Sequence, residues 1–132
     1  MSHFRLFITV IIAAFVMGCD MEEKIPPRSE FKTIGNFIYT DTIVAPGTML
    51  RVGLIGMRTD YDLRALYSEV AYDGANVSNL VERSYATESE LERCERDFTI
   101  TTRSTIGTER WIFVVNDREG LVIKREIRIT TL

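Results

Sequence analysis

Two apolar runs joined by a short glycine-containing loop near the carboxyl end constrain this chain most. Trp111–Val115 is entirely apolar, residues 116–120 form the loop, and residues 121–130 alternate apolar with charged side chains. Three isoleucines of the second run share one face, because successive strand residues point to opposite faces: Ile123, Ile127 and Ile129. Gly120 ends the loop, where a hairpin needs a positive φ. The pattern predicts an antiparallel hairpin with one buried face.

Shorter runs of the same kind precede this hairpin, and turn sequences separate them. The other expected strands are residues 37–44, 48–57, 66–72, 77–81 and 98–102. Pro46-Gly47 and Asp73-Gly74 lie between such runs, and both dipeptides are typical of turns. About seven short strands predict an all-β fold, an antiparallel two-sheet sandwich. An eight-stranded barrel is the alternative.

The segment 75–97 has the weakest strand pattern in this region. Residues 84–96 are highly charged, which favours a crossing loop with one helical turn. Thr87 precedes Glu90 by three residues, the spacing of a capping box. We therefore expect a break between the strand at 77–81 and the next strand at residue 98.

Two segments of this region resemble PKD-like and immunoglobulin-like domains of bacterial cell-envelope lipoproteins. They are Ala45–Thr48, with the alternating residues after it, and Phe113–Gly120, which leads into the last strand. The resemblance covers residues 37–132 and implies a sandwich. The chain differs from true immunoglobulin domains, since it lacks their cysteine pair and Trp111 lies on the penultimate strand. The resemblance therefore implies the sandwich without antibody-like recognition.

Residues 1–18 have the organisation of a secretory signal. Arg5 gives a positive start, and Leu6–Met17 contains Thr9 as its only polar residue. Twelve helical residues span about 18 Å, well short of the ~30 Å hydrocarbon core of a bilayer. The length predicts a signal-peptide helix rather than a transmembrane helix.

The end of this signal resembles the bacterial lipobox. Val16, Gly18 and Cys19 match its aliphatic, small and cysteine positions, while Met17 is larger than the usual residue at its place. The resemblance implies cleavage between Gly18 and Cys19 and a diacylglycerol on the Cys19 sulfur. Additional acyl chains such as palmitate would hold the protein on a membrane of the cell envelope. A plain secretory signal with an incidental cysteine is the alternative.

The residues after Cys19 predict a tether. Asp20–Glu23 is acidic, and it resembles both an inner-membrane retention signal of enteric bacteria and a surface-export signal of other lineages. We favour the outer membrane over the inner, with the periplasmic or surface face left open. Pro26-Pro27 favours extended backbone. The expected organisation is a signal peptide at 1–18, a tether at 19–36 and a sandwich domain at 37–132.

Composition excludes several classes of site. Removal of residues 1–18 takes away His3, the only histidine, and Arg5, so the formal charge of −3 becomes −4. Histidine-dependent triads and zinc sites are therefore excluded. The remaining chain has no dinucleotide or P-loop motif, and its acidity argues against nucleic acid as a partner. Cys94 then has no disulfide partner, and we expect a buried thiol. We expect no cofactor.

The remaining candidates are carboxylates and aromatic residues. Five aspartates lie in expected turns or at strand ends, where carboxylates can bind calcium but are also common turn residues: Asp60, Asp62, Asp73, Asp97 and Asp117. They lack the spacing of a calcium loop, so we expect no metal site. Trp111 is expected in the core. Four tyrosines are the candidate ligand surface: Tyr61, Tyr67, Tyr72 and Tyr85.

The sequence thus favours a non-enzymatic, lipid-anchored envelope protein whose sandwich binds a protein or glycan partner. An accessory carbohydrate-binding lipoprotein that uses the tyrosine-rich region is the alternative. A small hydrolase is a weaker alternative, because it would rest on carboxylate pairs alone.

Overall fold

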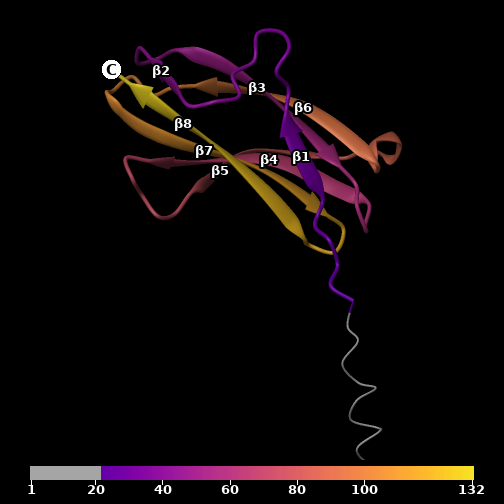
Figure 1. Ribbon diagram of the computed structural model, residues 1–132. Helices are drawn as coiled ribbons and strands as arrows, with labels where there is room; N and C mark the ends of the chain where they lie inside the picture. The colour runs from indigo at the N-terminus through magenta and orange to yellow at the C-terminus, as the bar shows by residue number, and fades with distance from the viewer. Residues whose placement is uncertain (1–21) are drawn as a thin grey trace, which may run out of the picture.

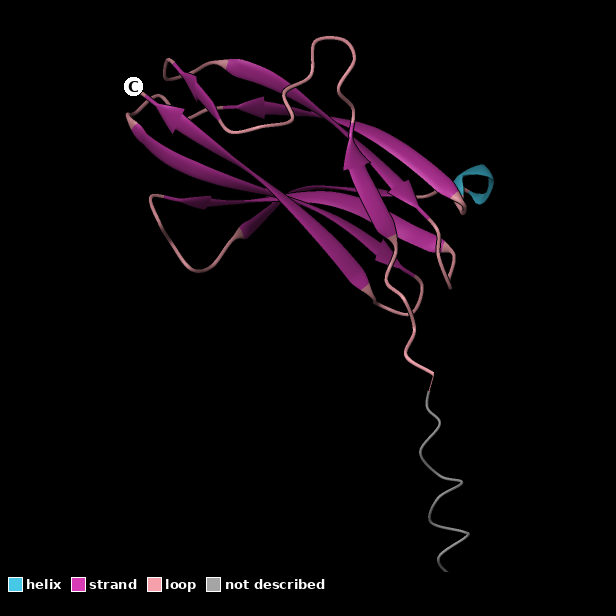
Figure 2. Cartoon of the chain, in the orientation of Figure 1, coloured by secondary structure: helices cyan, strands magenta, loops and turns pink. Residues whose placement is uncertain are grey.

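A computed structural model describes residues 22–132 as two β-sheets packed face to face (Figure 1). The expected signal peptide, the lipobox Val16–Cys19 and the lipid site Cys19 lie outside the described residues. Over 22–132, no helix is long and apolar enough to cross a membrane. The secondary structure is almost entirely strands and loops, with one short 3-10 helix, η1 (Glu88–Glu90) (Figure 2).

Eight strands, rather than the expected seven, build the sandwich. In chain order they are β1 (Arg28–Phe31), β2 (Thr42–Val44), β3 (Met49–Met57), β4 (Leu63–Tyr72), β5 (Asn79–Tyr85), β6 (Arg93–Thr101), β7 (Gly107–Asp117) and β8 (Val122–Thr131). The three-stranded sheet has the order β1-β3-β6, and the five-stranded sheet has the order β2-β8-β7-β4-β5. The all-β, two-sheet prediction is confirmed.

The carboxyl-terminal hairpin forms as predicted from β7 and β8. Gly120 has a φ of +86°, the left-handed conformation that the loop requires. Ile127 and Ile129 are fully buried on the inner face, and Ile123 packs against the core from the same face. Alternation of apolar and charged residues therefore fixes which side of this hairpin faces the other sheet.

The core lies between the sheets and is centred on aromatic residues. Phe113 of β7 contacts Phe31 of β1 with ring centroids 5.6 Å apart, and Phe98 of β6 at 5.7 Å. Trp111 is buried beside it, as expected. Phe113 thus joins the five-stranded sheet to both edge strands of the smaller sheet.

Three details differ from the sequence expectation. Residues 28–31, placed in the tether, form β1 and pair with β3, with Ser29 and Phe31 turned inward. Of residues 37–44, only 42–44 form a strand. That strand, β2, pairs with β8 in parallel, whereas every other described pairing is antiparallel. These short edge strands depend on partners distant in sequence, which a local pattern does not reveal.

The charged segment before residue 98 is more ordered than expected. β5 extends to Tyr85, η1 follows, and β6 begins at Arg93 rather than at 98. The capping pair is confirmed, because the Thr87 backbone N–H and hydroxyl both donate to Glu90 Oε1, at 3.1 and 2.8 Å. Arg96 turns inward on β6, where it donates to Glu90 and to Ser84 Oγ at 2.6 Å.

Candidate functional site

The strand register places four rows of side chains on the outer face of the five-stranded sheet. The first row is Ala71, Arg110 and Arg128; the second is Leu80, Glu69, Ile112 and Glu126; the third is Arg83, Tyr67, Val114 and Lys124; the fourth is Tyr85, Ala65, Asn116 and Val122. We call this surface the outer face. Its inner counterpart packs on the core, so the outer face is where this sheet can meet a ligand.

The outer face has a buried apolar floor, although no other strand covers it. Val114 is 0% exposed and Ile112 is 5% exposed, and Ala65 and Ala71 are similarly buried. Their burial means that neighbouring side chains cover them, and long ones such as Lys124, opposite Val114, can do so with their aliphatic parts while their charged groups stay in solvent. A ligand on this face therefore meets polar groups above an apolar base.

The rows also give this face a charge opposite to that of the protein. Four cationic side chains, Arg83, Arg110, Lys124 and Arg128, stand beside three carboxylates, Glu69, Glu126 and, at the β2 edge, Asp41. The whole chain carries a formal charge of −3. A net positive face on an acidic protein favours contact with negatively charged groups.

Two of the four expected tyrosines meet at one end of the outer face. Tyr85 lies opposite Ala65 and Tyr67 lies opposite Arg83, so the tyrosines are diagonal neighbours on adjacent strands. The guanidinium of Arg83 stands 5.1 Å from the Tyr67 ring centroid, and partial burial raises the pKa of the Tyr67 phenol. Tyr85 is 57% exposed. We call this the tyrosine end.

A small hollow adjoins the tyrosine end. Its volume is about 180 Å³, and Arg64, Arg83, Tyr85 and Asn116 are among the residues that line it. Asn116 Oδ1 is buried and has no hydrogen-bond partner in the described part of the chain. An unpaired buried acceptor costs free energy, so a donor that reached this oxygen would gain a full hydrogen bond.

The other two tyrosines lie elsewhere. Tyr72, at the end of β4, packs against the core and is covered by the guanidinium of Arg103, 4.1 Å from its ring centroid. Tyr61 lies half-buried in the loop between β3 and β4. The structure therefore separates the predicted four-residue surface into one neighbouring pair and two residues in other settings.

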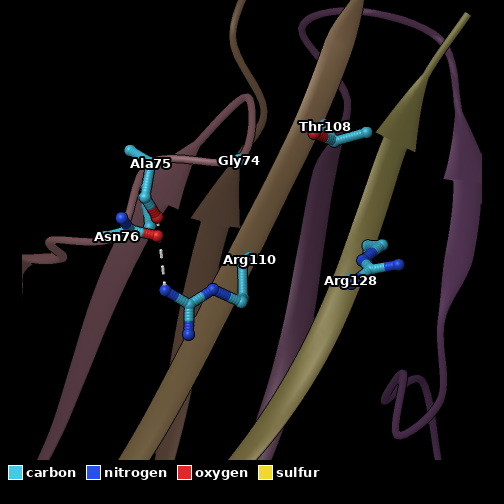
Figure 3. Close-up of a pocket in the computed structure, with 7 residues that line it drawn as sticks. Gly74, Ala75, Asn76, Thr108, Arg110 and Arg128 are labelled. Carbon is cyan, nitrogen blue, oxygen red and sulfur yellow. Dashed lines mark hydrogen bonds between the residues drawn. The ribbon is translucent and has the colours of Figure 1, made fainter.

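A larger hollow lies at the opposite end of the outer face, beside the loop between β4 and β5 (Figure 3). Its volume is about 490 Å³. Arg110 donates to Glu126 Oε1 at 2.9 Å and turns its guanidinium toward the Ala75 carbonyl, 3.4 Å away. Arg128 lies directly across from Arg110, and no ion pair of its side chain is found over residues 22–132. We call this the arginine hollow.

The sequence pattern reveals only part of the arginine hollow. Alternation along the last expected strand places Arg128 on the side opposite Ile127 and Ile129. A loop at 116–120 would pair residue 115 with residue 121 and so place Arg110 opposite Glu126. The observed register pairs Asn116 with Val122 and places Arg110 opposite Arg128, two residues further on.

The expected aspartates do not gather into a metal site. Within the described residues, no group of three or more acidic or thiol side chains is placed to hold a metal ion. All five have partners within the protein, and four of these partners lie outside the aspartate's own loop or are basic side chains: Asp60 with the Ile25 N–H, Asp62 with Arg58, Asp73 with Arg103, and Asp97 with Lys32. Asp117 is buried and accepts the N–H groups of the β7–β8 loop.

Cys94 is fully buried, as expected of a structural thiol. Burial raises its pKa to about 11, so the nucleophilic thiolate is scarce at neutral pH. The residue packs as a small apolar side chain of β6.

Neither a protein-family model nor a curated protein sequence matches this chain. Among solved structures, the chain is similar to a chitin-binding domain from Burkholderia pseudomallei, with a TM-score of 0.50 and 13% identity over 71% of this chain and 58% of that one. It is also similar to a family 123 glycoside hydrolase from Clostridium perfringens, with a TM-score of 0.54 and 7% identity over 80% of this chain and 27% of that one. The chain thus spans less than two thirds of either. At these identities the likeness establishes the sandwich fold.

Proposed function

We propose that this protein is a non-enzymatic, lipid-anchored binding protein of the bacterial cell envelope whose outer face binds a glycan. The observation that carries the proposal is the tyrosine end, where the exposed Tyr85 stands diagonal to Tyr67 beside a hollow. Exposed aromatic rings offer flat apolar surfaces, and the neighbouring polar groups can hydrogen-bond sugar hydroxyls. The glycan is preferred over a protein partner on this ground.

Several further observations support a binding rather than a catalytic function. Both hollows lie on the outside of a sheet, and each is lined mainly by arginine, amide and small residues. The chitin-binding domain and the glycoside hydrolase with similar folds give the glycan proposal a precedent in the same architecture. A PKD-like or immunoglobulin-like ancestry is part of the proposal, since the turn sequences at 45–48 and 113–120 resemble those domains.

A glycan array with the full-length protein, followed by affinity measurements, tests the binding function. We expect Tyr85→Ala to weaken binding of the best glycan by about tenfold, the loss expected for one stacking contact. Tyr39→Ala is the matched control, because Tyr39 is also exposed but lies in the segment before β2. Equal affinities of wild type and Tyr85→Ala would exclude the tyrosine end as the binding surface.

The membrane anchor is tested separately. We expect labelled palmitate to enter the wild-type protein and not the Cys19→Ala variant, because the sulfur of Cys19 is the proposed first site of lipid attachment. Equal labelling of the two would contradict the anchor without affecting the glycan proposal. Protease treatment of intact cells would then distinguish a surface from a periplasmic location, and membrane fractionation would distinguish the outer from the inner membrane.

A further inference from the structure

The arginine hollow contains an arrangement that costs stability in the isolated protein. Arg110 and Arg128 face each other on adjacent strands, where like charges directly opposite are destabilising. Glu126 pairs with Arg110, and the nearest recorded carboxylate contact of Arg128 is from its backbone N–H to Asp41 Oδ1 at 2.9 Å. Asp73, at the rim, is already held by Arg103 at 2.8 Å. The charge of the Arg128 side chain is therefore left for an external partner.

The shape and lining of the hollow suit an oxyanion attached to a larger ligand. Its volume of about 490 Å³ lies within the usual range for small-ligand sites. The small residues Gly74 and Ala75 leave room beside the arginines, and the amide of Asn76 adds further polar groups (Figure 3). Guanidinium groups bind carboxylate, sulfate and phosphate through paired hydrogen bonds.

The hollow shares a surface with the tyrosine end. Arg110 and Asn116 are six residues apart on β7, which is about 20 Å of strand. An extended oligosaccharide that lies along β7 would therefore contact both ends of the outer face. The two intervening rows bury Ile112 and Val114 beneath neighbouring side chains such as Lys124, so the ligand would lie over these side chains.

The chain also holds the hollow away from the proposed anchor. The Ile25 N–H donates to Asp60 at 2.7 Å and the Ile25 carbonyl accepts from Thr59 at 2.8 Å, so the segment leading to the amino terminus is fixed at the β3–β4 loop. The arginine hollow lies beside the β4–β5 loop, at the other end of the ten-residue strand β4. In a membrane-anchored protein this position leaves the hollow accessible.

We propose that the arginine hollow binds the carboxylate of an acidic glycan, so that the ligand of the outer face is a polysaccharide containing uronic acid. This inference rests on the proposed glycan-binding function and specifies its ligand class. Charge complementarity supports this inference. The outer face is positive on an acidic protein, and the Arg128 side chain forms no ion pair within residues 22–132.

The test compares two probes that differ at the carboxyl group alone, the anionic oligogalacturonate and its uncharged methyl ester, on the full-length protein in non-ionic detergent. We expect the wild type to bind the acid about tenfold more tightly than the ester, because the acid adds one charge-assisted contact with an arginine. Arg128→Gln should remove this preference and leave the affinity for the ester unchanged. Arg51→Gln, on the other sheet, is the matched control and should keep the preference.

A second measurement reports on the hollow directly. Titration with monomeric galacturonate should shift the side-chain Nε–H signals of Arg110 and Arg128 in NMR spectra, and the uncharged sugar galactose should not. In the Arg128→Gln variant, the same spectra show whether the protein is folded and whether the Arg110 signal still shifts. They therefore distinguish loss of the anion site from loss of folding.

The outcomes separate this inference from the proposed function. Equal wild-type affinity for the acid and the ester, with no shift at Arg110 or Arg128, would overturn the carboxylate site and leave glycan binding intact. Binding of neither oligosaccharide, together with a negative glycan array, would overturn both. Binding to vesicles rich in phosphatidylglycerol that is lost in Arg128→Gln, without a preference between the sugars, would replace the glycan with an anionic membrane surface.

Discussion

The outer surfaces of the two sheets use similar side chains in opposite ways. On the three-stranded sheet, Asp97 accepts from Lys32 at 2.9 Å and from Arg51 at 3.2 Å, and Phe37 lies under both cations, 5.5 and 4.7 Å from its ring centroid. On the five-stranded sheet, Arg110 faces Arg128 instead. The first surface pairs its charges within the protein, whereas on the second Arg110 pairs with Glu126 and the Arg128 side chain has no ion pair within residues 22–132.

This difference bears on which surface is proposed to bind the ligand. Charges that are paired and covered add to stability and leave little for a ligand. Charges held close to others of the same sign cost free energy, and local conflicts of this kind are expected at functional sites. The comparison therefore supports the proposal that the binding surface lies on the larger sheet.

The largest expected effect comes from a core residue that lies beneath both outer surfaces. Its loss should destabilise the whole protein, whatever the difference between the two surfaces. Phe113→Ala removes the ring that contacts Phe31 and Phe98 and should cost about 3–5 kcal/mol. Chemical denaturation measures the change. Phe37→Ala, on the surface of the smaller sheet, should cost only about 1 kcal/mol, the contribution of its cation–π contacts. A loss for Phe113→Ala as small as that for Phe37→Ala would contradict the proposed core.

The second prediction concerns the pH dependence of stability and the carboxyl group of Asp73, which lies beside the arginine hollow. Hydrogen bonds from Arg103 and the Thr108 N–H lower the pKa of Asp73 to about 2. A carboxyl whose pKa is depressed by folding stabilises the protein above its unfolded pKa, and this contribution is lost as the pH falls toward 2. The stability of the wild type should therefore decrease between about pH 4 and pH 2.

Asp73→Asn removes this titration, so the variant should show a shallower decrease in urea midpoint over the same range. Glu90, whose pKa is also lowered by Arg96, still titrates in the variant and accounts for a residual slope. Identical slopes for the two proteins would show that the Asp73–Arg103 pair contributes no pH dependence.

The sequence predicts the parts of this molecule whose pattern is local. The hairpin of β7 and β8 follows from alternation and from Gly120, and the burial of Cys94 and Trp111 follows from their apolar character. The capping pair Thr87 and Glu90 is likewise a local arrangement. In each case the residues that decide the structure lie within a few positions of one another.

The parts that were missed depend on distant partners. The high charge of residues 84–96 predicts a loop before residue 98, yet Arg96 turns inward on β6 because Glu90 pairs with its charge and Ser84 accepts a further hydrogen bond. β1 is held by β3 and by Arg125, which donates to the Ser29 carbonyl from β8. The diagonal placement of Tyr67 and Tyr85 likewise depends on the register between β4 and β5, which includes a bulge after Ser68.

The third prediction separates the two surfaces by what each loses. Asp97→Ala breaks two ion pairs on the smaller sheet and should cost about 0.5–1 kcal/mol, because both pairs are partly exposed. The same variant should bind glycans as the wild type does. Denaturation and affinity measurements on one preparation check both statements, and weakened glycan binding would place the recognition surface on the wrong sheet.

The smallest expected effect gives the sharpest test. The same type of substitution, arginine to glutamine, should lower the stability of the protein on one surface and raise it on the other. Arg51→Gln removes an ion pair and a cation–π contact, so it should lower stability by about 0.5 kcal/mol. Arg128→Gln removes repulsion with Arg110, so it should raise stability by a few tenths of a kcal/mol. Both changes should shrink in about 1 M salt, where the Debye length falls to about 3 Å. A loss of stability in Arg128→Gln would mean that Arg128 has a stabilising partner within the protein and is not reserved for a ligand.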